Sequence, residues 1–506
     1  MTRIWRMWVA VVVVVVLILS GGGSVQADDL LAGVARVDVS DPAAAPVHDP
    51  CQAKVLVLRQ GERTAVFITV DVVAIGEIGL SNRFLPSVRE RLQHDLNISP
   101  DCVLANASHC HGKVRADSDA LVVKAVKEAV GRLVRVRAGV GVATESRISE
   151  NRRLTLADGR QADMRRAYAL PPEETLTVAG PIDPRVGVLR LDRLDGTPLA
   201  VLYQFACHPI MNPPNLGSSA DFPGYASNLL ETALGHDSIA FFVQGCGGDI
   251  NPRRYKETSH PPDAEPYGNL LGMTVLQAVR SIKADANASL RVAREILSLP
   301  RAEDYDARIA AIEAERLRLL NGLTPTNIDF KAFLPLYLGQ KLKPEHPAQH
   351  AQSYLHNQLI GDPSLNRLDA TNRGEVEAYV SNLRAMEQLT RLNVNLALLQ
   401  KHRSERKAAA ASTIDVELCG LRVGDFKLLT FPGELTSGVG LQFARKANDP
   451  HTFLSGYTNG YIYYTPTAAE RKNSGYAQED CDSIVAPEWH DVFEKRALSL
   501  LQKLGR

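Results

Sequence analysis

Four apolar segments of this 506-residue chain each end in a short motif that carries histidine, aspartate or glutamate. They are residues 103–105, 201–206, 239–243 and 426–431, which run into Asn106-Ala-Ser-His-Cys-His-Gly112, Cys207-His-Pro209, Gln244-Gly-Cys-Gly-Gly-Asp249 and Pro432-Gly-Glu434. In α/β folds, sites form beyond the carboxyl ends of strands. The repetition therefore predicts a single site that all four strand ends share.

The first 135 residues indicate the fold class. Residues 31–46 begin with an alternating strand, and residues 54–59 and 63–72 read as a hairpin that turns at 60–62. Residues 82–94 and 118–133 have the apolar spacing of helices. Strands that alternate with helices predict an α/β fold with a mixed β-sheet core flanked by helices.

Residues 300–410 have a different character. Helical patterns cover 304–320 and 375–401, and the second carries an apolar face that we expect to point inward to the fold, formed by Val376, Val380, Leu383 and Met386. This block is predicted to be a helical insertion in a larger α/β domain, and one role for it is a cover over the site.

The N-terminus reads as a targeting segment. Arg3 and Arg6 precede an apolar stretch at residues 7–19, and Val25-Gln-Ala27 fits a signal-peptidase site. We expect residues 1–27 to be a signal peptide cleaved near Ala27, with export to the periplasm or the medium. An uncleaved anchor is the alternative.

Charge and cysteine usage add two limits. The chain carries 57 basic and 57 acidic residues without a basic stripe, so a nucleic-acid partner is not expected. Its seven cysteines are an odd number, so at least one stays outside any disulfide.

The His-x-His pair in the first motif suggests metal or proton chemistry. Side chains alternate along an extended chain, so His109 and His111 would point the same way. Two such imidazoles can share a metal, or one can bind it while the other moves protons. The alternative is two structural histidines at a strand end.

Taken in order, these motifs resemble the neutral (non-lysosomal) ceramidase family. The resemblance covers about residues 31–480 and includes two further motifs, Glu150-Asn-Arg152 and Asn459-Gly-Tyr-Ile-Tyr-Tyr464. It implies a catalytic domain over residues 28–506 that binds Zn²⁺, without the C-terminal immunoglobulin-like domain that relatives often carry. The implied zinc ligands are His109, His208, Glu434 and Tyr464, and the implied catalytic residues are His111, Arg152 and Tyr476.

The chemistry of these residue types agrees with the resemblance. A catalytic zinc takes nitrogen and oxygen ligands and activates water. His111 could protonate the leaving amine, and Arg152 and Tyr476 could stabilise the negative charge of the intermediate. Considered alone, Arg152 would read as a surface ion pair, and Tyr464 and Tyr476 as packed aromatic residues.

These observations predict an enzyme, an exported zinc-dependent amidohydrolase. Its substrate would be ceramide, cleaved to a sphingoid base and a fatty acid, or a related N-acyl lipid or other N-acyl small molecule. Association with a membrane surface would fit a lipid substrate. The alternatives are a metal-dependent esterase or other amidase on the same fold, and a non-catalytic lipid- or glycan-binding relative.

Overall fold

The computed structural model describes residues 29–505, except 45, 77, 164–175, 213–216, 236, 256–262 and 474–476. The predicted signal peptide and Tyr476 lie outside the described residues. Within the described residues, no helix is long and apolar enough to cross a membrane.

A large mixed sheet forms the centre of the molecule. Its strand order is β12-β11-β10-β5-β1-β2-β3-β4. The bounds are β1 Leu31–Asp38, β2 Gln52–Gln60, β3 Arg63–Val70, β4 Val103–Ala107, β5 Val134–Thr144, β10 Arg185–Arg193, β11 Pro198–Phe205 and β12 Ile239–Gln244. β2 and β3 form the predicted hairpin, in which Gln60 pairs with Arg63. The β3–β4 and β11–β12 pairs are parallel and the other pairs antiparallel, so the sheet is mixed.

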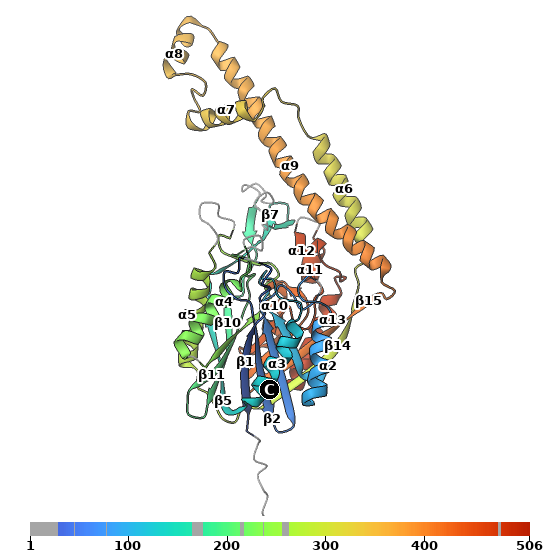
Figure 1. The fold of residues 1–506 in the computed structure, drawn as a ribbon. Coiled ribbons are helices and arrows are strands. Elements are labelled where there is room, and N and C mark those ends of the chain that lie inside the picture. Colours follow the sequence, from blue (N-terminus) through green and yellow to red (C-terminus); the bar gives the residue numbers. More distant parts are fainter. Residues whose placement is uncertain are drawn as a thin grey trace, which may run out of the picture.

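Helices cover one face of this sheet. They are α2 Phe84–Leu96, α3 Ser118–Gly131, α4 Asp221–Leu234 and α5 Glu265–Ser281. α3 packs on β1 and β2, while α4 and α5 pack on each other and on β12, β10 and β5. The predicted α/β class, a mixed sheet flanked by helices, is confirmed (Figure 1).

A second sheet covers the other face. It has the order β14-β15-β16-β18, with bounds β14 Leu290–Pro300, β15 Thr413–Val423, β16 Phe426–Thr430 and β18 Thr452–Ser455. Apolar side chains of both sheets form one core between them, and α10 Ser437–Ala447 and α13 Trp489–Leu504 pack on the outer side of the second sheet. Because the large sheet is covered on both faces, strands such as β3 and β12 read as continuous apolar runs.

Short elements connect these layers near the strand ends. They are η1 Pro100–Cys102, β6 Ser149–Asn151, β7 Arg153–Leu156, β8 Gln161–Asp163, β9 Leu176–Ala179, β13 Ile250–Pro252, β17 Glu434–Leu435, β19 Tyr464–Thr465, α11 Ala468–Arg471 and α12 Gln478–Cys481.

The predicted helical insertion is present and replaces the turn of a hairpin. It consists of α6 Tyr305–Asn321, α7 Phe330–Leu342, α8 Ala351–Ile360 and α9 Ser364–Ala408, between β14 and β15. Pro300 and Thr413 pair across the two strands from which it emerges. A hairpin end tolerates an insertion because its strands remain paired whatever the loop contains.

The insertion is an arm that extends away from the body, with α7 and α8 at its far end (Figure 1), so it does not fold over the body as a cover. The predicted inward face of α9 is correspondingly wrong in part. Val376 is buried, but Leu383 is 45% exposed and Met386 52% exposed. These two positions lie between the part of α9 that contacts α7 at Tyr379 and the part that packs with α6 from Leu389 onward, so neither contact buries them.

Asn106, near the end of β4, joins the two sheets. Its side-chain amide donates hydrogen bonds to Ser455 Oγ, Gly456 O and Thr458 Oγ1 at 3.1, 3.0 and 2.9 Å. Its Oδ1 accepts from the backbone N–H of Gln244 at 3.1 Å. One buried side chain therefore ties β4, the end of β12 and the segment after β18 together.

We expect Asn106→Ala to lower the melting temperature, because the partners of the lost amide stay buried. Leaving such groups unsatisfied costs about 1–3 kcal/mol each. Thermal unfolding followed by circular dichroism measures the effect. The matched control is Asn287→Ala, at an exposed position. Equal melting temperatures for the two variants would contradict the role assigned to Asn106.

Candidate metal centre

Three of the four predicted strand ends deliver side chains to one point. His109 follows β4, His208 follows β11, and Glu434 lies four residues after β16. Their ligand-type atoms all lie within 4.8 Å of one another, and all three residues are buried. The expectation of a shared site at the strand ends therefore agrees with the geometry.

The backbone at His109 differs from the expected extended strand. β4 ends at Ala107, and His109 has a φ of 67°, in the left-handed region. The strand argument that placed His109 and His111 side by side is therefore wrong. Their rings still lie near each other, with centroids 5.7 Å apart, and His111 is half-buried.

Both histidines near Glu434 are oriented by backbone carbonyls. Nδ1 of His109 donates to Val73 O at 2.6 Å, and Nδ1 of His208 donates to Gly247 O at 2.6 Å. Because a carbonyl can only accept, each ring carries its proton on Nδ1 and presents Nε2 to the centre. The Nε2 atoms of His109 and His208 lie 3.5 and 3.3 Å from Oε2 of Glu434. Metal-ligating histidines typically have such a partner on the other ring nitrogen.

Glu434 is 2% exposed and is held by two tyrosines. The hydroxyl of Tyr461 donates to its Oε1 at 2.5 Å and that of Tyr457 to its Oε2 at 3.3 Å. Burial acts to raise the pKa of Glu434, but His109, His208 and Tyr461 outweigh it and hold that pKa below its usual range. Burial lowers the pKa of His109 to about 4. At neutral pH the centre thus presents a carboxylate and a neutral imidazole, the forms that bind metal.

Tyr464 is placed beside Glu434 by strand pairing. β17 and β19 are parallel neighbours, and Glu434 pairs with Tyr464 in their register. Nη2 of Arg152 donates to the Tyr464 hydroxyl oxygen at 3.2 Å. The Tyr464 hydroxyl oxygen is therefore a candidate ligand atom next to the three clustered residues.

Arg152 is 1% exposed and makes several contacts inside the protein. Its Nε pairs with Glu479 at 2.7 Å, its Nη1 donates to Asn251 at 3.2 Å, and its Nη2 also donates to Gly248 O at 2.5 Å. Burial acts to lower the pKa of Arg152, but Glu479 and Tyr464 raise it well above the ordinary value. It is therefore a buried, permanently charged group and not a surface ion pair.

The glycine-rich motif brings two backbones together. A Cβ on Gly248 would lie 2.6 Å from Glu434 O, too close for any side chain, and the Gly248 N–H donates to Leu435 O at 2.9 Å. Gly247 supplies the carbonyl that holds His208. The glycines thus permit the loop after β12 to lie against the Glu434 segment, which agrees with a close backbone approach.

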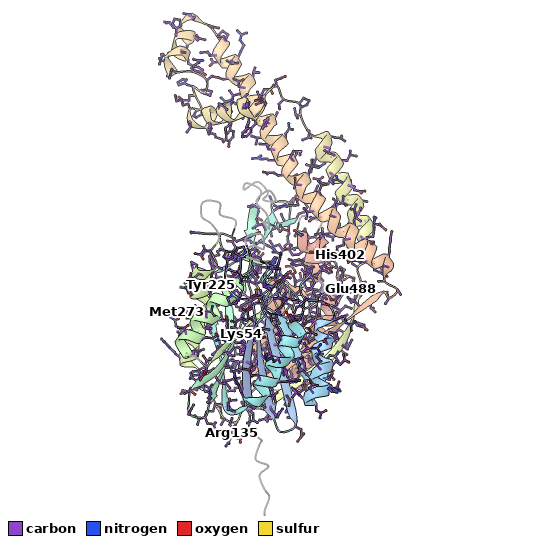
Figure 2. All side chains as sticks on the ribbon, in the orientation of Figure 1. Lys54, Arg135, Tyr225, Met273, His402 and Glu488 are labelled. Atoms are coloured by element: carbon purple, nitrogen blue, oxygen red, sulfur yellow. The ribbon has the colours of Figure 1, made fainter. Side chains whose placement is uncertain are left out.

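Sequence reasoning missed Tyr457, Tyr461 and Glu479 as site residues. Tyr461 lies inside a motif that was singled out, but no local pattern marks which of several nearby tyrosines contacts the carboxylate. It also missed the base of α9. Lys401 Nζ donates to the Tyr463 hydroxyl at 2.8 Å, and His402 Nε2 lies 2.8 Å from Asp482 Oδ1. Figure 2 shows His402 where the arm joins the body.

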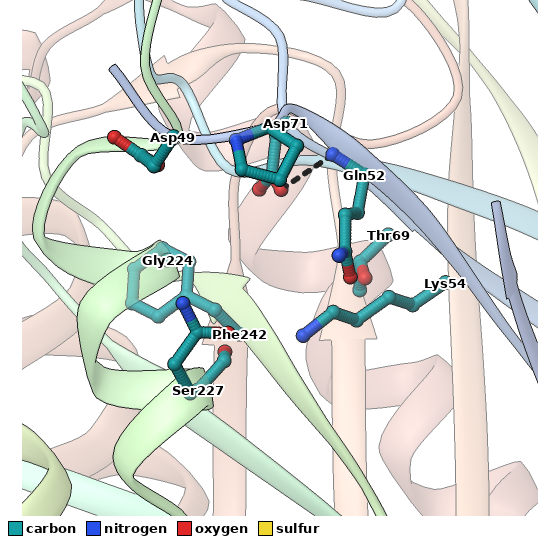
Figure 3. Close-up of a pocket in the computed structure, with 10 residues that line it drawn as sticks. Asp49, Gln52, Lys54, Thr69, Asp71, Gly224, Ser227 and Phe242 are labelled. Atoms are coloured by element: carbon teal, nitrogen blue, oxygen red, sulfur yellow. Dashed lines mark hydrogen bonds between the residues drawn. The ribbon is translucent and has the colours of Figure 1, made fainter. Parts of the chain in front are cut away.

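Several cavities in the described part of the chain lie outside this centre. A polar cavity of about 20 Å³ is lined by Lys54, Asp71 and Phe242, among others (Figure 3). It has room for roughly one water molecule. A larger cavity, about 560 Å³, lies where α6 and α9 meet the segment around Arg471.

Comparison with known proteins gives the fold. No protein-family model and no curated protein matches the sequence. Among solved structures, the neutral ceramidase from Pseudomonas aeruginosa is similar with a TM-score of 0.60 and 16% sequence identity, over 94% of this chain and 75% of that chain. A ceramidase complexed with C2 is similar with a TM-score of 0.59 and 15% identity, over the same shares. The chain has a neutral-ceramidase-like fold.

Proposed function

We propose that this chain is a zinc-dependent hydrolase of an N-acyl (amide) bond, with ceramide or a related N-acyl lipid as its substrate. The observation that carries the proposal is the buried convergence of His109, His208 and Glu434, whose ligand-type atoms lie within 4.8 Å of one another. The likeness in fold to ceramidases supports the substrate class.

The donor set fits zinc. Two imidazole nitrogens and a carboxylate oxygen are the ligands of many catalytic zinc sites, and the Tyr464 oxygen would add a fourth ligand. A bound zinc ion would supply Lewis acidity toward water and toward the substrate carbonyl. The backbone carbonyls on both Nδ1 atoms fix the ligand tautomers before any metal binds.

Each remaining residue has a proposed task in the reaction. His111, beside His109, moves the proton that the departing amine needs. Arg152 positions the Tyr464 hydroxyl, and Glu479 in turn holds Arg152. Charge stabilisation by Arg152 and Tyr476 stays a prediction, as does export after cleavage near Ala27.

The first prediction concerns the metal. Protein purified without added metal should carry about one zinc per chain. His208→Ala and Glu434→Ala should each lose most of the metal and the activity, because each removes one of the four proposed ligands. Elemental analysis and an activity assay measure both. The matched control is His94→Ala, at an exposed position, which should change neither. A wild-type protein without transition metal, before and after zinc addition, would exclude the metal centre.

The second prediction separates the two histidines of the His-x-His pair. His111→Ala should keep the metal and slow turnover by roughly 100-fold or more, the usual contribution of a positioned acid or base. His109→Ala should lose the metal. Metal content measured beside kcat distinguishes them. Loss of zinc from His111→Ala would show that His111 is itself a ligand.

The third prediction concerns the bond cleaved. The same residues could hydrolyse an ester or another amide, and a binding protein could keep the fold without turnover. We expect kcat/KM to be highest for an N-acyl lipid in a panel of long- and short-chain ceramides, N-acyl amino acids and simple esters. The His208→Ala variant is the blank for each substrate. Turnover of esters alone would favour the esterase, and zinc binding without turnover would favour the binding protein.

A further inference from the structure

The far end of the arm exposes apolar side chains. We call this the tip surface, and its residues are Phe330, Leu334, Leu338 and Leu342 of α7 and Leu355, Leu359 and Ile360 of α8. Leu359 is 83% exposed and Leu342 77% exposed. In the described part of the chain, most of the exposed large apolar side chains lie between residues 317 and 386. Such a concentration in one place marks an interaction surface.

Each tip helix is attached to α9 through one buried aromatic residue. On α7, Phe333 stacks on Tyr379 of α9 with ring centroids 4.4 Å apart. On α8, the hydroxyl of Tyr354 donates to Asp369 of α9. Phe333 and Tyr354 are buried, while the leucines around them face solvent. These leucines therefore remain available to a partner without unfolding the arm.

The tip carries positive charge in a chain that is neutral overall. Residues 330–360 contain Lys331, Lys341 and Lys343 against one acidic residue, Glu345, and are flanked by Asp329 and Asp362. The whole chain has 57 basic and 57 acidic residues. All three lysines are exposed. Lysines beside exposed leucine and phenylalanine match an anionic lipid surface, where the ammonium groups meet the headgroups and the apolar groups enter the layer beneath.

The shape of the tip favours a bilayer over a second copy of the chain. α7 and α8, of 13 and 10 residues, are too short to span a membrane but long enough to lie in its interface. They form the projecting end of the arm (Figure 1), which suits insertion into a deformable layer. Two copies joined by their tips would bring lysines of like charge together.

We propose that the tip surface is a membrane-binding element that inserts its leucines into the headgroup region of an anionic bilayer. Membrane binding through the tip requires no catalysis, so its evidence is separate from that for the hydrolase. If the substrate is a lipid, the arm also holds the enzyme at the surface that carries that substrate; only this consequence rests on the proposed function.

Sedimentation of the full chain with vesicles tests the proposal. We expect binding to vesicles of phosphatidylcholine mixed with phosphatidylserine, and weaker binding to phosphatidylcholine alone. Replacing Leu355 and Leu359 together by serine should weaken binding by roughly tenfold or more, because two apolar anchors are lost. Lys341→Gln combined with Lys343→Gln should reduce the preference for phosphatidylserine. All samples must share one N-terminus, because the apolar residues 7–19 would themselves bind lipid.

The matched control replaces exposed apolar residues of the body, Met273→Ser with Leu194→Ser, and should bind vesicles like the wild type. Figure 2 labels Met273 on α5, away from the arm. Equal vesicle binding by the tip variant and the wild type would overturn the proposal. If the wild type is a dimer and the tip variant a monomer, with unchanged vesicle binding, the surface would be a contact between copies of the chain. Vesicle binding by a protein that turns over no member of the panel of ceramides, N-acyl amino acids and esters would refute the hydrolase and leave the membrane element standing.

Discussion

The buried carboxylate of Glu434 is the constraint on which the centre depends. A charge that is 2% exposed is costly unless it is compensated by partners. Here the partners are two imidazoles and two tyrosine hydroxyls, all within 3.5 Å of its oxygens. A divalent cation among these groups would add the strongest compensation, since neutral imidazoles and hydroxyls do not balance a full negative charge.

Holding Glu434 in place requires both sheets. The histidines come from the large sheet, while Glu434 follows β16 of the second sheet. Asn106 bonds across the junction, and Gly248 lets the loop after β12 lie against the Glu434 backbone. Each contact joins segments far apart in the sequence, so the centre is a product of how the layers pack. Any change that shifts one sheet against the other would separate the ligands.

The arm connects the body to a surface far from the candidate metal centre. Its last turns reach the segment that carries Tyr464, because Lys401 bonds Tyr463 and His402 bonds Asp482. Its other end presents leucines and lysines to solvent. One long helix, α9, thus runs from the neighbourhood of the candidate metal centre to the tip surface. If both proposals hold, lipid attachment and chemistry lie at opposite ends of α9.

Local pattern in the sequence was sufficient for much of the fold. The apolar runs of β2 and β3 indicate strands buried on both faces, and the period of 3.6 in α2 and α3 indicates which side of each helix is buried; both patterns are local in the chain. The polar motifs at strand ends were visible for the same reason. They predicted one shared site that includes His109, His208 and Glu434.

Only the tertiary structure decided the rest. One example is the left-handed backbone of His109, which no periodicity indicates. Others are the hydrogen bonds of Tyr457 and Tyr461 to Glu434 and the ion pair of Arg152 with Glu479, which join residues that periodicity does not relate. The sequence also did not predict that the arm extends away from the body, because that direction depends on tertiary contacts. An apolar face on α9 predicts that something covers it, but not whether a core lies there. Leu383 and Met386 are exposed because this stretch of α9 lies outside the body of the molecule.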